Sequence, residues 1–182
     1  MVVIRILFWV LFFCLNFSFV QSQEMLWSID SKLTWADFNA EPDVDHPYAA
    51  ITYSGMSYSF SAEVINNQVK VNYTVNCFFI PNKSWVKSEY KSDVELLKHE
   101  QLHFDISELY ARKFREQLSK ISFTENVKVE ISDLYEKITK EKIELQNEYD
   151  IETDHSVNVL KQKNWEQKIL IELQKRAVYA SK

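Results

Sequence analysis

The sequence is poor in cysteine, glycine and proline, with two cysteines, one glycine and three prolines in 182 residues. Cys14 lies in an apolar N-terminal segment that we expect to be removed, so the mature chain keeps only Cys77 and cannot form an intramolecular disulfide. A buried, unreactive thiol in a strand is the expected state of Cys77. The single glycine, Gly55, marks a point at which a strand is expected to bend.

Only one long apolar run is present, and it lies at the N-terminus. A short basic start containing Arg5 precedes the apolar stretch Ile6–Val20, and the small residue Ser22 follows it. This order is typical of a secretory signal peptide over residues 1–22, with cleavage before Gln23. Because the run is short for a bilayer span, we expect a secreted or periplasmic protein with no stable membrane insertion after signal cleavage.

Basic residues are outnumbered by acidic ones. Arg5 is the only charged residue of the signal peptide, so 20 basic and 26 acidic residues give the mature chain a net charge of about −6. This balance disfavours nucleic acid and anionic membranes as partners. Residues 23–182 have an ordinary length for one domain and contain no internal repeat or low-complexity segment.

Glycine and proline are absent from residues 92–121, which contain the most informative motif. The spacing Ser92-x-x-Glu95 is that of a capping box and predicts a helix from there to about residue 121. Within it, His99-Glu100-Gln101-Leu102-His103 reads His-Glu-x-x-His. Four residues turn a helix by about 400°, so the two histidines share one face and can bind one Zn²⁺, while Glu100 can hold a water molecule beside it.

The helical angle places both histidines on the apolar side of this helix. The apolar side consists of Leu96, His99, His103, Ile106, Tyr110 and Phe114. The opposite, polar stripe consists of Lys98, Gln101, Asp105, Glu108, Arg112 and Glu116. A buried imidazole needs a partner, and a metal ion would satisfy both rings at once; the alternative is a histidine pair that only hydrogen-bonds to carbonyls or a carboxylate. Glu108 and Arg112 are expected to form a surface ion pair.

Strand patterns precede the motif helix. Residues 49–60 are rich in Thr, Tyr and Ser, residues 69–79 alternate apolar and polar side chains, and Asn66-Asn67 lies between them as a turn. An aromatic-rich entry segment is expected to pack onto the core through Trp27, Leu33, Trp35 and Phe38. The predicted fold class is α+β, with a small antiparallel sheet packed on the long motif helix and followed by C-terminal helices.

The C-terminal part is predicted to be mainly helical. Residues 127–131 are expected to form a short strand or an extended link, and residues 132–146 a charged helix with a solvated face. Residues 149–155 break the helical pattern. Residues 156–179 are predicted to form the final helix.

A catalytic zinc takes three protein ligands, and the motif helix supplies two. His155, in the irregular segment before the final helix, is the expected third ligand. Glu152 and Asp154 remain alternatives because a carboxylate also binds zinc, although Asp154 is well placed to cap the final helix. His46 is expected to be a solvated loop residue, and Tyr149 is expected to pack in the core.

Several longer segments carry a family resemblance. They are Leu33–Phe38, Ala49–Gly55, Ser84–Val86, Leu96–Arg112 and Tyr149–His155, followed by Gln162 and Trp165. On these segments the chain resembles a bacterial family of predicted secreted zinc-dependent proteases that is described as a domain of unknown function. The resemblance implies one zincin-like metallopeptidase domain over residues 23–182, built around a zincin-type active-site helix. In it His99 and His103 are zinc ligands and Glu100 is the general base. It also supports a role for His155, but this chain has Ser156 where the family often has glycine.

The expected function is that of a secreted zinc-dependent peptidase with Zn²⁺ as cofactor and a peptide or protein as substrate. The zinc ion polarises the scissile carbonyl and lowers the pKa of a water molecule, whose proton Glu100 takes and passes to the leaving amine. A strand edge in the region Val69–Phe79 is a candidate site for an extended peptide. Two alternatives remain open: a non-catalytic envelope protein with a structural zinc or a partner-binding role, and a zinc amidase that acts on cell-wall peptides.

Overall fold

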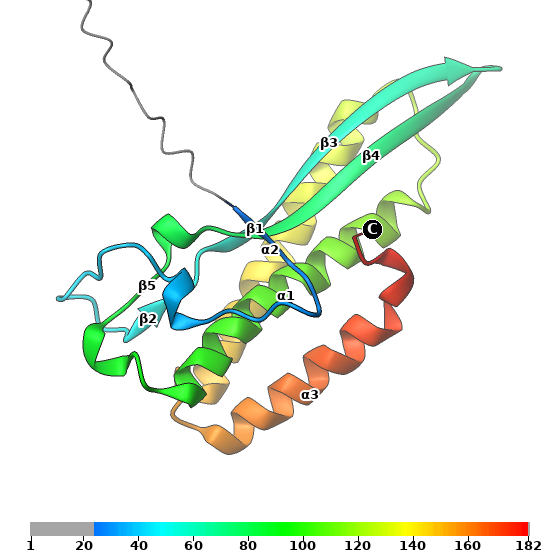
Figure 1. Ribbon diagram of the computed structural model, residues 1–182. Helices are drawn as coiled ribbons and strands as arrows, with labels where there is room; N and C mark the ends of the chain where they lie inside the picture. The colour runs from blue at the N-terminus through cyan, green and yellow to red at the C-terminus, as the bar shows by residue number, and fades with distance from the viewer. Residues whose placement is uncertain (1–23, 182) are drawn as a thin grey trace, which may run out of the picture.

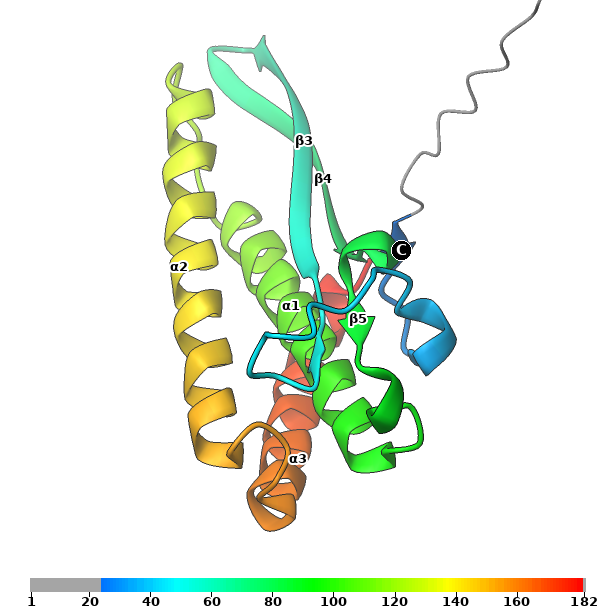
Figure 2. The same cartoon turned by 90° about the vertical axis from the view of Figure 1, so that its left-hand side faces the viewer.

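The computed structural model describes residues 24–181, so the predicted signal peptide at residues 1–22 lies outside the described part of the chain. The fold is α+β, as predicted. Helix α1 (Val94–Leu118) carries the histidine motif and contacts the two other long helices and the strands. Figure 1 shows the β3–β4 hairpin on one side of α1 and α3 on the other, and Figure 2 shows α2 beside both the hairpin and α1.

The strands form two antiparallel sheets. The larger sheet has the order β1-β4-β3 and consists of β1 (Met25–Leu26), β3 (Ser54–Ile65) and β4 (Gln68–Phe79). The smaller sheet pairs β2 (Ala50–Ile51) with β5 (Trp85–Val86). The predicted antiparallel sheet is therefore confirmed, but residues 49–60 do not form one bent strand. They divide at Thr52-Tyr53 into β2 and the start of β3.

The hairpin between β3 and β4 follows from its turn residues. Asn66 and Asn67 both have a positive φ, at 51° and 59°, and they join the paired residues Ile65 and Gln68. A two-residue turn of this kind matches the twist of the flanking strands, and asparagine tolerates the left-handed conformation. This part of the prediction is confirmed.

Gly55 has a steric role rather than a conformational one. It pairs across the sheet with Phe78, and an added Cβ would lie 3.1 Å from Cζ of the Phe78 ring. The missing side chain therefore lets this ring lie over the β3 backbone.

Helix α1 begins and ends close to its predicted limits, but its surroundings differ. Its N-cap is Asp93, whose carboxylate accepts a hydrogen bond from the Leu96 amide at 2.9 Å, and not the predicted Ser92. The central part of the polar stripe is buried: Asp105 is 8% exposed, Glu108 0% and Arg112 6%.

Two segments cover this stripe of α1. Nε1 of Trp27 in the entry segment donates to Asp105 at 2.7 Å, and Nη1 of Arg112 donates to the Leu173 carbonyl of α3 at 2.7 Å. The prediction of a surface ion pair between Glu108 and Arg112 is wrong, because the pair exists at 2.9 Å but is buried. The middle of α1 is therefore covered on this side too, and its charges are paired inside the protein.

Helix α2 (Val127–Thr153) is longer at both ends than predicted. Residues 127–131 are its first turn, so the predicted short strand or extended link is wrong. Ile131 and Ile138 are buried in the core, and Val127 packs against it, which favours the helix over local strand propensity. The predicted irregular segment 149–155 is also wrong for its first five residues, because Tyr149 and Thr153 continue the buried face of the same helix.

Helix α3 (Val159–Lys175) is shorter than the predicted helix over residues 156–179, and a single 3-10 turn, Ala177–Tyr179, follows it. Its N-cap is Asn158, whose side chain accepts from the Lys161 amide at 3.1 Å. Asp154 does not cap α3 as expected. It is the C-cap of α2 and adopts a left-handed conformation with φ 48°.

The core fills the space around α1. The entry segment packs onto it as predicted: Trp27, Leu33 and Phe38 are buried, and Trp35 packs against the cluster. Cys77 is a buried free thiol in β4, also as predicted. Within residues 24–181, no helix combines the length and the apolar character that are needed to cross a lipid bilayer.

Candidate metal centre

The two motif histidines face one another from successive turns of α1. Their Nε2 atoms are 3.2 Å apart, and the ring planes are nearly perpendicular at 88°. His99 is 3% exposed, and the side chain of His103 is 15% exposed. The helical spacing of the motif therefore brings the rings together as predicted.

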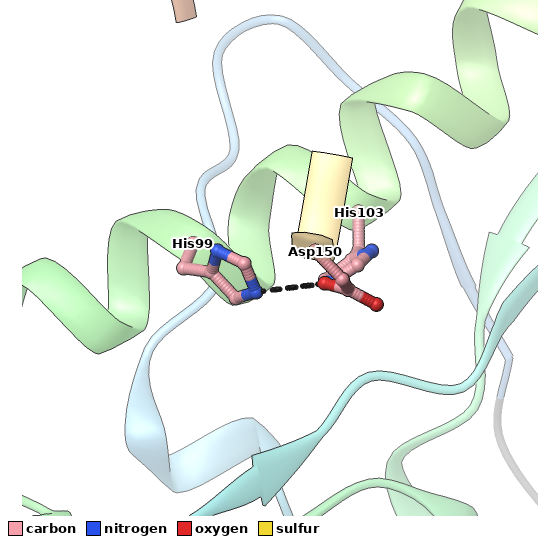
Figure 3. Close-up of side chains that lie close together, drawn as sticks. All are labelled: His99, His103 and Asp150. Carbon is pink, nitrogen blue, oxygen red and sulfur yellow. Dashed lines mark hydrogen bonds and ion pairs between the residues drawn. The ribbon is translucent and has the colours of Figure 1, made fainter. Parts of the chain in front are cut away.

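A third group reaches the same point from α2. Oδ1 of Asp150 lies 3.1 Å from Nε2 of His99 and 2.9 Å from Nε2 of His103. Figure 3 shows the three side chains pointing toward one another, with Asp150 arriving from the neighbouring helix. One atom from each of the three groups lies within 4.8 Å of the others, which is the spacing of a metal ligand set.

The charges within this cluster are strongly coupled. Burial alone would lower the pKa of His103, but the hydrogen bond to Asp150 and the negative charges of Asp150 and Glu100 outweigh it and raise the pKa to about 9. Burial alone would raise the pKa of Asp150, but hydrogen bonds from His103 and His99 hold it well below its usual range. Asp150 is thus ionised at neutral pH, and an ion at this point meets a negative ligand.

Glu100 lies beside the cluster and is 4% exposed. Its Oε2 atom is buried and has no hydrogen-bond partner among the described residues. A buried carboxylate oxygen without a partner is costly, so its retention needs an explanation in the chemistry of the site. A water molecule or substrate group that donates a hydrogen bond to Glu100 would provide the missing partner.

A cavity of about 210 Å³ opens next to these groups. Its polar lining consists of His99, Glu100, His103, Asp150 and His155, and its remaining lining consists of Tyr48, Ala49, Ala50, Ile51, Thr52 and Leu96. Strand β2 therefore forms part of the wall. β2 pairs with β5 on one side and has no strand on its other side in the described part of the chain. No residue of Val69–Phe79 lines the cavity, so that strand edge lies away from the centre.

His155, the expected third ligand, lies at the rim of this cavity. Its side chain is 44% exposed, its Nδ1 atom is 4.0 Å from Oδ1 of Asp150, and its ring lies 4.6 Å from that of Tyr48. It does not belong to the group of three converging ligand atoms. The backbone at residues 154–156 has three consecutive positive φ angles of 48°, 48° and 84°, although none of the three is a glycine.

The remaining candidates point elsewhere. Oε2 of Glu152 accepts from Nε1 of Trp165 at 3.0 Å. Tyr149 is fully buried, as expected, and its hydroxyl donates to Oε1 of Gln162 at 2.6 Å. His46 lies in a loop and contacts the rings of Tyr48 and Trp85.

Sequence reasoning did not single out Asp150 as a ligand. Gln146 and Asp150 are one turn apart, and both reach the histidines, Gln146 through His103. Gln146 and Asp150 have helical spacing, as do the buried residues Tyr149 and Thr153, and this spacing could have indicated that the helix continues through Asp150. It was missed because an irregular segment was predicted for residues 149–155. Because α2 continues to Thr153, the side chain of Asp150 lies on the side of α2 that faces the motif helix.

The donor set fits a transition-metal ion. Two Nε2 atoms and a carboxylate oxygen meet at one point, and all three are electron-pair donors when the rings are neutral. A cation there would satisfy all three, and two histidines with one carboxylate are a known zinc ligand set. The fold and site thus define a class: an α+β protein with a candidate metal centre between two helices and an open cavity beside it.

Comparison with known proteins gives the family. The model of the DUF922 family, described as a bacterial protein of unknown function, matches residues 40–156, and the chain belongs to this family. The match includes the motif helix and Asp150 and ends before α3. The comparisons with curated proteins and with solved structures gave no significant match.

Proposed function

We propose that the protein is a secreted zinc-dependent peptidase in which His99, His103 and Asp150 hold the metal ion and Glu100 is the general base. The observation that carries the proposal is the convergence of these three ligands beside a buried carboxylate that has no hydrogen-bond partner in the described chain. Bound Zn²⁺ would supply Lewis acidity, which polarises a carbonyl group and lowers the pKa of water.

The chain's own groups account for the other requirements of peptide hydrolysis. Glu100 follows His99 directly and lines the same cavity, so its carboxylate is placed to take a proton from water and to return it to the leaving amine. The burial of Glu100 keeps this carboxylate away from bulk solvent.

The site has three protein ligands and an adjoining cavity, which favours catalysis over a purely structural ion. A structural zinc is normally enclosed by four protein ligands, whereas a catalytic one keeps a position open. His155 lies at the rim but outside the ligand group, so the position next to the cavity is free of protein ligands among the described residues.

The substrate is proposed to be an extended peptide. The segment Ala49–Thr52 lines the cavity, and β2 within it has one edge that no strand of residues 24–181 pairs with, so a peptide backbone can add alongside it as a further strand. The proposed peptide site is therefore β2, and not the edge of Val69–Phe79 that the sequence suggested.

The decisive experiment compares metal content and hydrolysis in one variant. Glu100→Gln keeps the shape of the side chain and removes the base, so it is expected to retain zinc and to lose cleavage of a casein-like substrate. Glu144→Gln, an exposed change on α2, is the matched control and should leave both unchanged. Full cleavage by Glu100→Gln would refute the role of the base, and cleavage of peptidoglycan fragments in place of protein would replace peptidase by amidase.

A further inference from the structure

Two glutamine side chains contact the outer nitrogens of the motif histidines. Oε1 of Gln162, from α3, lies 3.2 Å from Nδ1 of His99, and Oε1 of Gln146, from α2, lies within hydrogen-bond distance of Nδ1 of His103. Gln162 is completely buried. Each of the three long helices thus contributes to the surroundings of the candidate ion.

Independent contacts fix which end of each amide faces its histidine. Nε2 of Gln162 donates to the Glu166 carboxylate at 3.1 Å, while its Oε1 accepts from the Tyr149 hydroxyl at 2.6 Å. Nε2 of Gln146 donates to the backbone carbonyl of His103 at 3.0 Å. Rotating either amide by 180° would place its oxygen against another acceptor, the Glu166 carboxylate or the His103 carbonyl, so the oxygens must face the imidazoles.

These contacts determine where the imidazole protons lie. An amide oxygen only accepts hydrogen bonds, so the ring nitrogen that faces it must carry the proton. An ion bound between the rings would displace any proton on Nε2, which faces the Asp150 carboxylate, and each ring would then keep its proton on Nδ1 and its lone pair on Nε2. Both Nε2 atoms lie within 3.2 Å of one another and of Oδ1 of Asp150, which is the point proposed for the ion.

The orientation of the His99 ring is restrained further by stacking. Tyr149 lies over it with ring centroids 4.5 Å apart and an interplanar angle of 23°. Since Tyr149 also donates to Gln162, the same residue holds both the ring and the amide that orients it.

We propose that Gln146 and Gln162 are positioning residues that fix the Nδ1-protonated form of His103 and His99, so that both Nε2 lone pairs point at the metal ion. The proposal rests on the metal site of the proposed function. It also makes α3 part of the centre, although Gln162 lies beyond the residues matched by the family model. Partners of this kind typically alter metal affinity 10- to 100-fold.

The structure also explains why these partners are amides and not carboxylates. Each amide must accept at Oε1 and donate at Nε2, and a glutamate at position 162 would place two carboxylates together because Glu166 lies 3.1 Å away. A double change, Gln162→Glu with Glu166→Gln, exchanges donor and acceptor and preserves every contact. This pair provides a rescue that a simple packing role does not predict.

The test uses the purified full-length protein and Zn²⁺ in competition with a chromophoric chelator. Gln162→Met and Gln146→Met keep the length of the side chain and remove the acceptor, and each is expected to weaken zinc binding about 10- to 100-fold. The double variant Gln162→Glu/Glu166→Gln is expected to bind zinc with the affinity of the wild type. The exposed Gln167→Met should not change the zinc affinity. Unchanged affinity in the Met variants, or equal loss in the rescue variant, would overturn the proposal.

A second measurement does not depend on metal binding. Imidazole ¹⁵N shifts of the metal-free protein report whether Nδ1 of each ring carries a proton. The expected result is a proton on Nδ1 in both rings, and an Nδ1 atom without a proton in either ring would overturn the proposal. If the protein bound no zinc, the proposed function would fail, while these shifts would still decide the role of the glutamines.

Discussion

Oδ1 of Asp150 lies 2.9 Å from Nε2 of His103, and this contact joins the last turns of α2 to the middle of the motif helix. The carboxylate therefore has the same position relative to the two histidines that a third metal ligand requires. His155, five residues further along the chain, reaches only to 4.0 Å from that carboxylate.

We predict that Asp150→Asn loses bound zinc and that His155→Ala retains most of it. An amide is a neutral and weaker ligand than a carboxylate, whereas the imidazole of His155 lies outside the group of converging atoms. Metal content after dialysis measures both variants. Asp133→Asn, an exposed change on the same helix, is the control. Zinc loss in His155→Ala with retention in Asp150→Asn would identify His155 as the ligand after all.

We predict that zinc stabilises the folded protein and that removing it lowers the free energy of unfolding. An ion that binds only the native state at 100 times its Kd adds about 2.7 kcal/mol. Thermal unfolding of the wild type should therefore shift upward when zinc replaces a chelator, and the shift should vanish in His99→Ala/His103→Ala. An equal shift in the double variant would mean that zinc binds elsewhere. His46→Ala is a control for the loss of a histidine outside the cluster.

We predict that the metal-free protein loses stability as the pH rises from about 6.5 to about 9. The pKa of His103 is 6.5 when unfolded and about 9 in the fold, so its stabilising contribution is complete below pH 6.5 and disappears as the pH passes 9. Zinc binding should become tighter over the same range, because the ion displaces this proton. Urea midpoints and zinc titrations across this range measure the two effects.

The control for this pH dependence is His103→Gln, which has no titrating ring at this position. Its urea midpoint without metal should vary less between pH 6.5 and 9 than that of the wild type. Equal slopes in the two proteins would show that other groups cause the dependence.

We predict that Glu108→Ala destabilises the fold far more than Glu116→Ala, although both change a glutamate of α1. Glu108 is fully buried and accepts from Arg112 at 2.9 Å and from Arg115 at 3.2 Å, so its removal leaves two buried guanidinium groups without a counter-charge. The expected loss is about 3–5 kcal/mol. Glu116 pairs with Lys120 and Arg176 nearer to solvent, and its removal should cost less than about 1 kcal/mol. Similar losses in urea unfolding would contradict this.

The sequence predicts those features that depend on short-range spacing. The histidine pair follows from a four-residue interval on a helix, and the hairpin follows from Asn66-Asn67 between alternating strands. Both are set by neighbours in the chain, and both are confirmed. The α+β class also follows, because the strand and helix patterns are separated along the sequence.

Other features depend on contacts between distant segments, and the sequence alone did not predict them. Residues 127–131 contain β-branched side chains that favour a strand locally, but burial of Ile131 against the core makes them helical. The stripe that contains Glu108 looks solvent-exposed by its polarity, and only its cover by Trp27 and α3 shows otherwise. The position of Asp150 beside the histidines likewise requires the packing of α2 on α1.

The proposed metal ligands and the two glutamines that orient them come from three helices. This arrangement determines when the site can form. Helix α1 by itself brings only His99 and His103 together, while Asp150, Gln146 and Gln162 reach them when α2 and α3 pack against it. The complete ligand set that we propose is therefore assembled only when α2 and α3 are packed against α1. The peptidase activity that we propose would then arise only in the folded chain, after its own backbone had been packed away from the site.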